Sequence, residues 1–294
     1  KNLIDFTKKY LLVINEAFSF FFIFLLSLTF AYFLFQLLKI NVVSIIENSN
    51  QYQKNLNFFL ELISRNTILE AFLSENLLKD INLIGIFSNL LNLIKSFTGN
   101  FTLVLVYLIF IVIEEKFFIL KLNLVLKNEN KKKLFSKINN DIYNYFRIKT
   151  FTSLLTALFT FMILFFLNNE LSITFAIFAF FLNFIPYIGS LLAVMLPSLF
   201  ATIQFMEFFT PILTLILLLV SQIFIGNFLE TKLMGKTLNI SPIALIIFLS
   251  LMGKIWGLAG MFLSVPLLVI LIIFLNNFKE TKKIAIFLTE KGID

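Results

Sequence analysis

Long apolar runs dominate the pattern of hydrophobic and polar positions along this chain. A helix needs about 20 consecutive apolar residues to cross the hydrocarbon core of a bilayer. The pattern predicts unbroken transmembrane helices over residues 17–38, 101–120, 150–167 and 211–229. Such a series is typical of an all-α integral membrane protein built as a multi-span helical bundle.

Two further apolar blocks are interrupted by helix-breaking residues. Residues 171–206 contain the sequence NFIPYIG, and residues 240–275 contain Pro242 and the sequence GKIWGLAG. Non-helical backbone at membrane depth is tolerated only where protein buries it or where it lines a water-filled cavity. We therefore expect two Pro/Gly-broken, re-entrant helical hairpins that dip from opposite faces, as in inverted-repeat transporters. A topology in which these blocks cross the membrane completely also places the basic segment at 121–149 and the C-terminal tail on the same side.

Residues 41–99 follow a different pattern, in which apolar residues recur at helical spacing among polar ones. Leu56, Phe59, Leu60 and Ile63 form one such stripe. This pattern predicts an extramembrane segment of amphipathic helices, either a spacer or a dedicated binding domain. The chain then divides into an N-terminal interfacial helix with the first span (1–40), the amphipathic segment (41–99) and a transmembrane transport domain (100–294).

Residues 121–149 are strongly basic, with eight Lys and Arg against two acidic residues. Short connections rich in Lys and Arg stay in the cytoplasm, so we expect a basic cytoplasmic loop here. A patch for anionic lipids is a compatible alternative. The tail that contains Lys279, Lys282 and Lys283 should also be cytoplasmic, with residues 41–99 on the other side.

Composition narrows the function classes. Hydrophobic residues make up 59% of the chain and charged residues 14%, against about 25% charged in soluble domains. There is no Cys and no His, which excludes thiol nucleophiles, disulfides and imidazole chemistry. No paired-carboxylate motif is visible. We therefore expect no enzyme activity, no cofactor and no metal site. The net charge of +7 follows from topology, so nucleic acid is not an expected partner.

Three sequence blocks carry a resemblance to a known family. Residues 183–189 read NFIPYIG, residues 227–242 read NFLETKLMGKTLNISP, and residues 256–267 read WGLAGMFLSVPL. They are similar to the motifs of the autoinducer-2 exporter family of bacterial permeases, in the same order, over about residues 103–274. Ser190 and Thr231 stand where the family usually has Pro, and Ser264 stands for Ala. The resemblance implies export of a small signal molecule, or sodium–proton exchange as in other branches of the family.

The candidate site residues are polar or helix-breaking positions within these blocks. A proline frees backbone carbonyls, and an amide can donate and accept at once, which suits a hydroxylated solute or a cation. We expect a midplane cavity in which these groups converge. The substrate-binding candidates are Asn183, Pro186, Gly189, Gln222, Asn227, Asn239, Ser241 and Pro242.

Three carboxylates are candidates for coupling transport to an ion, because ionisable groups within spans default to functional roles. Glu230 follows Asn227 by three residues, which would put both on one helix face. Its structural alternative is a salt bridge to Lys232 or Lys236. Glu114 and Glu115 are the other candidates, with an interfacial ion pair to the adjacent Lys116 as the alternative.

The remaining motif residues are expected to break or pack helices. Small residues let helices approach closely, and Trp256 can anchor at an interface. The structural candidates are Gly235, Gly253, Trp256, Gly257, Gly260 and Pro266.

Three functions remain open. The first is an exporter of a small polar or amphipathic solute by alternating access, the second a sodium/proton or other cation antiporter, and the third a non-transporting membrane scaffold. Broken helices favour a transporter over a scaffold. We expect a multi-pass protein of the bacterial cytoplasmic (inner) membrane that contacts membrane lipids and a small-molecule or ion substrate and forms a homo-oligomer.

Overall fold

The computed structural model describes residues 16–64, 129–234, 239–278 and 280–292, together with isolated helical positions between 107 and 121. Every regular element in these ranges is a helix. The chain divides into two compact units, Lys1–Val125 and Leu126–Asp294. Most of the span expected at 101–120, and residues 65–99, lie outside the described residues. The expected boundaries at 40 and 99 stay predictions.

The first unit contains the helices α2 (Glu16–Glu47) and α3 (Ser49–Ser64). Helix α2 contains the whole of the expected first span and continues for nine residues beyond it. Helix α3 has one buried face, formed by Ser49, Tyr52 and Leu56 at helical spacing. The amphipathic helical pattern is therefore confirmed as far as residue 64.

The second unit is organised around one long helix, α7 (Glu129–Phe166). At 1.5 Å per residue it is about 57 Å long, nearly twice the ~30 Å hydrocarbon core. Residues 129–149, which were expected to be a basic loop, form its first half. The basic segment and the following span are thus one continuous helix.

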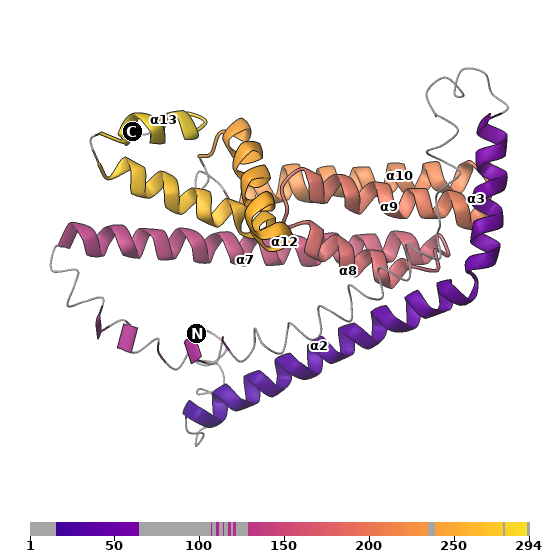
Figure 1. The fold of residues 1–294 in the computed structure, drawn as a ribbon, viewed down its shortest axis with the longest axis horizontal. Helices are drawn as coiled ribbons and strands as arrows, with labels where there is room; N and C mark the ends of the chain where they lie inside the picture. Colours follow the sequence, from indigo (N-terminus) through magenta and orange to yellow (C-terminus); the bar gives the residue numbers. More distant parts are fainter. Residues whose placement is uncertain are drawn as a thin grey trace. The chain divides into compact units, whose positions relative to one another are not determined.

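Against the C-terminal half of α7 lies a helical hairpin of α8 (Ser172–Leu182) and α9 (Ile188–Phe205) (Figure 1). Near the end of α9, Gln204 binds the corner that joins α7 to α8. Its Nε2 donates to the Asn168 carbonyl (2.8 Å), and its Oε1 accepts from the Glu170 N–H (3.2 Å). The block therefore begins and ends at the same end of α7, as a hairpin requires.

A continuous helical run follows the hairpin and packs against α9 and α7. It consists of α10 (Phe209–Gln222), the π-helix η1 (Ile223–Glu230) and the short α11 (Thr231–Met234). The expected span at 211–229 is confirmed as helical. Its second half is a π-helix, however, which the hydrophobic pattern did not predict.

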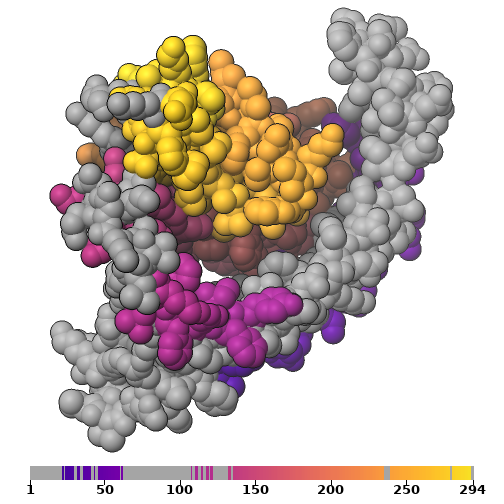
Figure 2. All heavy atoms as spheres, turned by 60° about the vertical axis from the view of Figure 1, so that its left-hand side comes forward, coloured from indigo at the N-terminus to yellow at the C-terminus, as the bar shows by residue number. Residues whose placement is uncertain are grey.

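Two helices complete the unit, α12 (Pro242–Asn276) and α13 (Lys282–Leu288). Helix α12 is sharply kinked at Gly257, whose φ of 60° and ψ of −141° are non-helical. Its start and the chain after it lie together, because the Ser241 N–H donates to the Leu288 carbonyl (2.9 Å). Figure 2 shows α12 and α13 as one continuous orange and yellow surface.

The two broken blocks thus approach each other along α7, α8–α9 from its C-terminal half and α12 from its N-terminal half (Figure 1). They meet where the rings of Phe184 and Phe262 stack, with centroids 4.4 Å apart. The expected breaks near Pro186 and between Gly253 and Gly260 are confirmed. One detail was wrong, because Pro242 begins α12 and does not break it; Pro266, expected to break or pack helices, lies buried inside the second arm of α12. Proline fits the first turn of a helix, and membrane helices tolerate it further along.

Among the described residues, four helical runs are long and apolar enough to cross a membrane. They are Phe135–Phe166, Ile188–Phe205, Phe209–Met234 and Pro242–Asn276. Many of their large apolar side chains are exposed, including Leu191, Val220 and Phe228, each at 60–61%. An apolar outer surface of this extent is what a bilayer requires and water penalises.

Candidate functional site

A stripe of polar side chains runs along one side of α7 through otherwise apolar sequence. The stripe consists of Lys149, Thr152, Ser153, Thr156 and Thr160. Each has another member three or four residues away, and all are buried (0–7% exposed). We call these five residues the α7 polar stripe. The Thr156 hydroxyl donates to the Thr152 carbonyl (3.0 Å) one turn earlier. Such bonds let hydroxyl side chains be buried in a helix at little cost.

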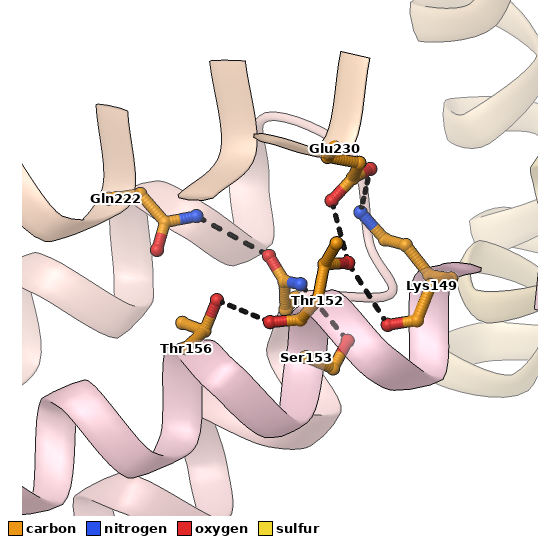
Figure 3. Close-up of polar contacts among 7 residues, drawn as sticks. Lys149, Thr152, Ser153, Thr156, Gln222 and Glu230 are labelled. Carbon is orange, nitrogen blue, oxygen red and sulfur yellow. Dashed lines mark hydrogen bonds and ion pairs between the residues drawn. The ribbon is translucent and has the colours of Figure 1, made fainter. Parts of the chain in front are cut away.

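At the start of the stripe, Lys149 forms an ion pair with Glu230, the last residue of η1. The Lys149 Nζ lies 2.6 Å from Glu230 Oε1, and the two side chains are only 8% and 15% exposed. The Thr152 hydroxyl lies 3.1 Å from Glu230 Oε2 and 3.2 Å from the Lys149 carbonyl (Figure 3). Its single proton serves one acceptor at a time. Both carboxylate oxygens therefore have a donor within reach, as a buried charge requires.

One turn further along the stripe, two amides connect the other elements to α7. The Gln222 Nε2, at the end of α10, donates to Asn183 Oδ1 (3.4 Å). The Asn183 Nδ2 donates in turn to the Ser153 hydroxyl (3.0 Å). Asn183 is 4% exposed and caps the C-terminus of α8. The polar cluster thus comprises Lys149, Thr152, Ser153, Asn183, Gln222 and Glu230, taken from α7, the α8–α9 turn and the α10–η1 run (Figure 3).

The α8–α9 turn explains how Asn183 reaches this position. Pro186 has no N–H to continue the helix, and Tyr187 takes a positive φ of 60°. The first turn of α9 then packs directly on the last carbonyl of α8, so that a Cβ built on Gly189 would lie 1.7 Å from Leu182 O. Only glycine fits there. Pro186 and Gly189, expected to bind substrate, therefore shape the turn that positions Asn183.

The π-helix η1 explains why Glu230 faces α7 while Asn227 does not. Its backbone bonds run from i to i+5, so a spacing of three no longer places two residues on one face. Asn227 is exposed, whereas Glu230 reaches the buried stripe. The prediction that both share a face was wrong for this reason. The alternative partner Lys232 was also wrong, because its Nζ lies over the Phe228 ring at 5.9 Å.

The remaining substrate-binding candidates lie away from the cluster. Asn239 holds the C-terminal tail: its Nδ2 donates to the Gly292 carbonyl (2.6 Å), and its Oδ1 accepts from the N–H groups of Glu290 and Lys291. Ser241 binds the chain near the end of α13 through its N–H, and Pro242 is exposed. The expected convergence of all these groups in one cavity was therefore wrong at this end.

Glu114, the coupling candidate of the first unit that the structure describes, is exposed. Glu114 pairs with Lys121 at 3.1 Å, and both side chains are about two-thirds exposed (65% and 68%). Glu114 thus forms an ion pair, and its position at a membrane interface stays a prediction; the expected partner Lys116 lies outside the described residues. Glu115, Gly235 and Lys236 lie outside the described residues.

The structural candidates divide into two groups. Gly257 is the break itself, and a Cβ there would meet nothing within 4 Å. Gly260 is buried, and its Cβ would lie 2.0 Å from Met252 O on the first arm of α12. The Gly253 Cβ would meet only the flexible end of Met261. Both expected roles, unwinding and close packing, therefore occur in one kinked helix. Trp256 is 57% exposed beside the break.

Sequence reasoning missed the α7 polar stripe, three of whose residues belong to the polar cluster. Lys149 was counted with the basic segment, and Thr152, Ser153 and Thr156 were treated as part of an ordinary span. Their spacing of three or four was the available indication, because a hydroxyl stripe on an apolar helix marks a face that packs on other protein. Within the described residues, no group of three or more acidic side chains could hold a metal ion.

Comparison with known proteins identifies the family. Residues 10–280 match the model of the family described as AI-2E family transporter. The chain belongs to the AI-2E transporter family. A putative transport protein of Borreliella burgdorferi is 32% identical over 246 residues, which cover 81% of this chain and 67% of that protein.

Two relatives from Escherichia coli strain K12 match over half of this chain. The AI-2 transport protein TqsA is 35% identical over 153 residues, 51% of this chain and 44% of its own length. The putative transport protein YhhT is 32% identical over 147 residues, 50% of this chain and 42% of its own length. The match thus spans less than half the length of these two relatives, and the resemblance of this chain to the autoinducer-2 exporter family is confirmed by the family model.

Proposed function

We propose that this AI-2E transporter exports a small polar or amphipathic solute across the bacterial inner membrane by alternating access. The observation that carries the proposal is the polar cluster, buried where both helical breaks approach α7. Buried amides and charges in an apolar bundle are costly and mark substrate or ion pathways. A relative named as an AI-2 transport protein makes autoinducer-2 the first solute to test.

The arrangement of the hairpins supports alternating access. Gln204 binds the end of α9 to the corner before α8, which ties together the two ends of the α8–α9 hairpin. Asn239, just before α12, binds the tail after α13 and so ties together the two ends of the kinked α12 block. The first of these closures lies at the C-terminal end of α7 and the second at the tail that follows α13, and the two blocks are in contact through Phe184 and Phe262. Release of one closure at a time would expose the polar cluster to one side only. In the membrane, we assign the basic half of α7 to the cytoplasmic side.

The ion pair supports a role in coupling. Lys149 and Glu230 compensate each other's charge, so the closed site is close to neutral. A proton or a cation could take the place of Lys149 at the Glu230 carboxylate. It would neutralise the carboxylate and release the Lys149 ammonium group. This exchange suits solute export driven by an ion gradient. It also favours the second candidate function, cation or proton antiport, in which the ion itself is the cargo.

The test is transport in proteoliposomes made with the purified protein. Vesicles loaded with autoinducer-2 are assayed for efflux, with and without sodium and pH gradients. We expect wild-type efflux to respond to a gradient. Glu230→Gln removes the charge and keeps the shape, so it should abolish gradient-driven transport and leave gradient-independent exchange.

The matched control is Asn227→Ala, an exposed position on the same π-helix, which should behave as wild type. Sodium–proton exchange without any solute flux would favour the antiporter. Wild-type gradient-driven efflux in Glu230→Gln and Asn183→Ala alike would show that the polar cluster is not the transport site.

A further inference from the structure

Tyr145 carries a buried hydroxyl that the site described above does not use. It lies on α7 four residues before Lys149, on the same face, and is 5% exposed. Its ring packs in a cluster with Val265 and Val269 of α12 and with Met234 of α11. Among the described residues, its hydroxyl has no hydrogen-bond partner. A buried donor without an acceptor is rare and calls for a physical reason.

The course of the chain places this hydroxyl beside the ion pair. The η1–α11 run passes along α7, with Glu230 at Lys149 and Thr152, and Met234, four residues later, at Tyr145. Glu230 and Met234 are one helical turn apart on this run, so the Glu230 carboxylate and the Tyr145 ring lie at neighbouring turns of the same packing face of α7. A phenol can donate one hydrogen bond, and a carboxylate can accept several. Glu230 therefore has a potential donor on either side, Thr152 towards one end of α7 and Tyr145 towards the other.

We propose that Tyr145 is the alternate partner of Glu230 and holds its carboxylate when Lys149 is released during transport. The proposal rests on the function proposed above, in which Lys149 must leave Glu230 at one stage. A carboxylate that lost its only cation in this setting would need donors to remain buried. Thr152 supplies one, and Tyr145 supplies the second. In the conformation described, Lys149 occupies the carboxylate and the phenol is left without an acceptor.

The π-helix supplies the movement that this exchange requires. A π-helical segment contains a wider turn than the α-helix on either side of it, so a change of its register rotates Glu230 relative to α7. Among the described residues, the neighbouring groups do not compete for the carboxylate. Lys232 of α11 lies over the Phe228 ring, and α12 contributes only apolar side chains to the Tyr145 cluster, namely Leu245, Val265, Val269 and Ile273. Tyr145 is thus a positioning residue that also contacts α11 and α12.

The test is a double-mutant cycle in thermal stability, measured on the purified full chain in detergent. In the wild-type background, Tyr145→Phe keeps the ring and removes an unpaired hydroxyl, so the melting temperature should stay the same or rise. In a Lys149→Met background, the same change should lower it by at least about 4 °C, because Glu230 then depends on the phenol. Lys149→Gln is a second background in case Met prevents folding. Tyr143→Phe, an exposed position on α7, is the matched control and should be neutral in every background.

A second measurement needs only the single variant. Autoinducer-2 efflux by Tyr145→Phe should fall at least about tenfold at unchanged KM, because a bond to a charged group is lost in one state of the cycle. Additive effects in the cycle, or wild-type efflux in Tyr145→Phe, would overturn the proposal. If the cycle shows coupling but the wild-type protein moves no autoinducer-2, the contact stands and the proposed function fails.

Discussion

The two helical breaks of this transporter differ in what they contribute. At the α8–α9 break, Tyr187 is 54% exposed, but the turn begins with the buried residues 183–185, and Asn183 is bound to Ser153 and Gln222. At the α12 break, Gly257 is exposed and is flanked by Trp256 and Leu258, which are 57% and 72% exposed. One break carries polar groups into the protein, and the other changes the direction of an apolar helix.

This difference shows that a broken helix does not by itself identify a binding site. At the α8–α9 turn, the N–H groups of Phe184, Ile185 and Gly189 bond to nearby carbonyls of α8 and the turn, as the membrane requires. The α8–α9 turn also brings an amide onto a hydroxyl stripe, and only this combination makes a polar site. At α12 the same backbone irregularity brings its two arms together through Gly260 and Met252. Substitutions at the α8–α9 break should therefore affect both stability and transport, whereas substitutions at the α12 break should affect stability alone.

The largest loss of stability should come from substitutions of glycines whose Cα lies against the backbone of another segment. In Gly189→Ala, the Cβ would lie 1.7 Å from Leu182 O, and no side-chain movement relieves a clash with backbone. We expect a loss of stability on the order of 3 kcal/mol or more, with little folded protein recovered. Thermal unfolding followed by intrinsic fluorescence, with Trp256 as the single Trp, measures it.

Gly226→Ala is the matched control, because its Cβ would meet only Gln222 Nε2 at 3.5 Å. It should unfold near the wild-type temperature. Gly260→Ala tests the other break in the same way, since its Cβ would lie 2.0 Å from Met252 O. A Gly189→Ala protein with wild-type stability would mean that the α8–α9 turn is not packed as described.

Features of this fold that depend on neighbouring residues could be predicted from the sequence, whereas contacts between residues far apart in the sequence could not. Pro186 and Gly257 interrupt apolar runs, and that local pattern was enough to place both breaks. Lys149 could not be assigned, because its charge suits a cytoplasmic segment and its partner Glu230 is 81 residues away. Asn227 was misplaced because a π-helix changes the phase of its face, and hydrophobic periodicity does not indicate π-helices. Asn239 was misplaced because its partners lie in the C-terminal tail.

An intermediate effect is expected from Asn183, where chemistry and structure combine. Asn183→Ala removes both side-chain hydrogen bonds of Asn183 and leaves the buried Ser153 and the half-buried Gln222 with fewer partners. We expect a loss of about 2–3 kcal/mol in stability, together with weaker solute binding. Thermal unfolding and the KM for autoinducer-2 efflux measure the two effects separately.

Asn227→Ala is again the control, because an exposed amide should contribute less than about 0.5 kcal/mol. If Asn183→Ala lowered stability but left KM and turnover at wild-type values, Asn183 would be a structural residue only. The contrast between the two breaks would then disappear, since both would serve geometry alone.

The smallest effect should come from the α12 break. Gly257 has a positive φ of 60°, but a Cβ there would meet nothing within 4 Å. Gly257→Ala therefore introduces backbone strain without a clash, which costs about 1–2 kcal/mol. Because no polar group of the cluster lies on α12, the KM for efflux should stay at its wild-type value, and the melting temperature should fall by a few degrees at most. Gly253→Ala is the reference variant. If Gly257→Ala were as stable as Gly253→Ala but had a changed KM, the α12 break would also take part in binding. Gly253 is the appropriate reference because only the flexible end of Met261 lies in its way.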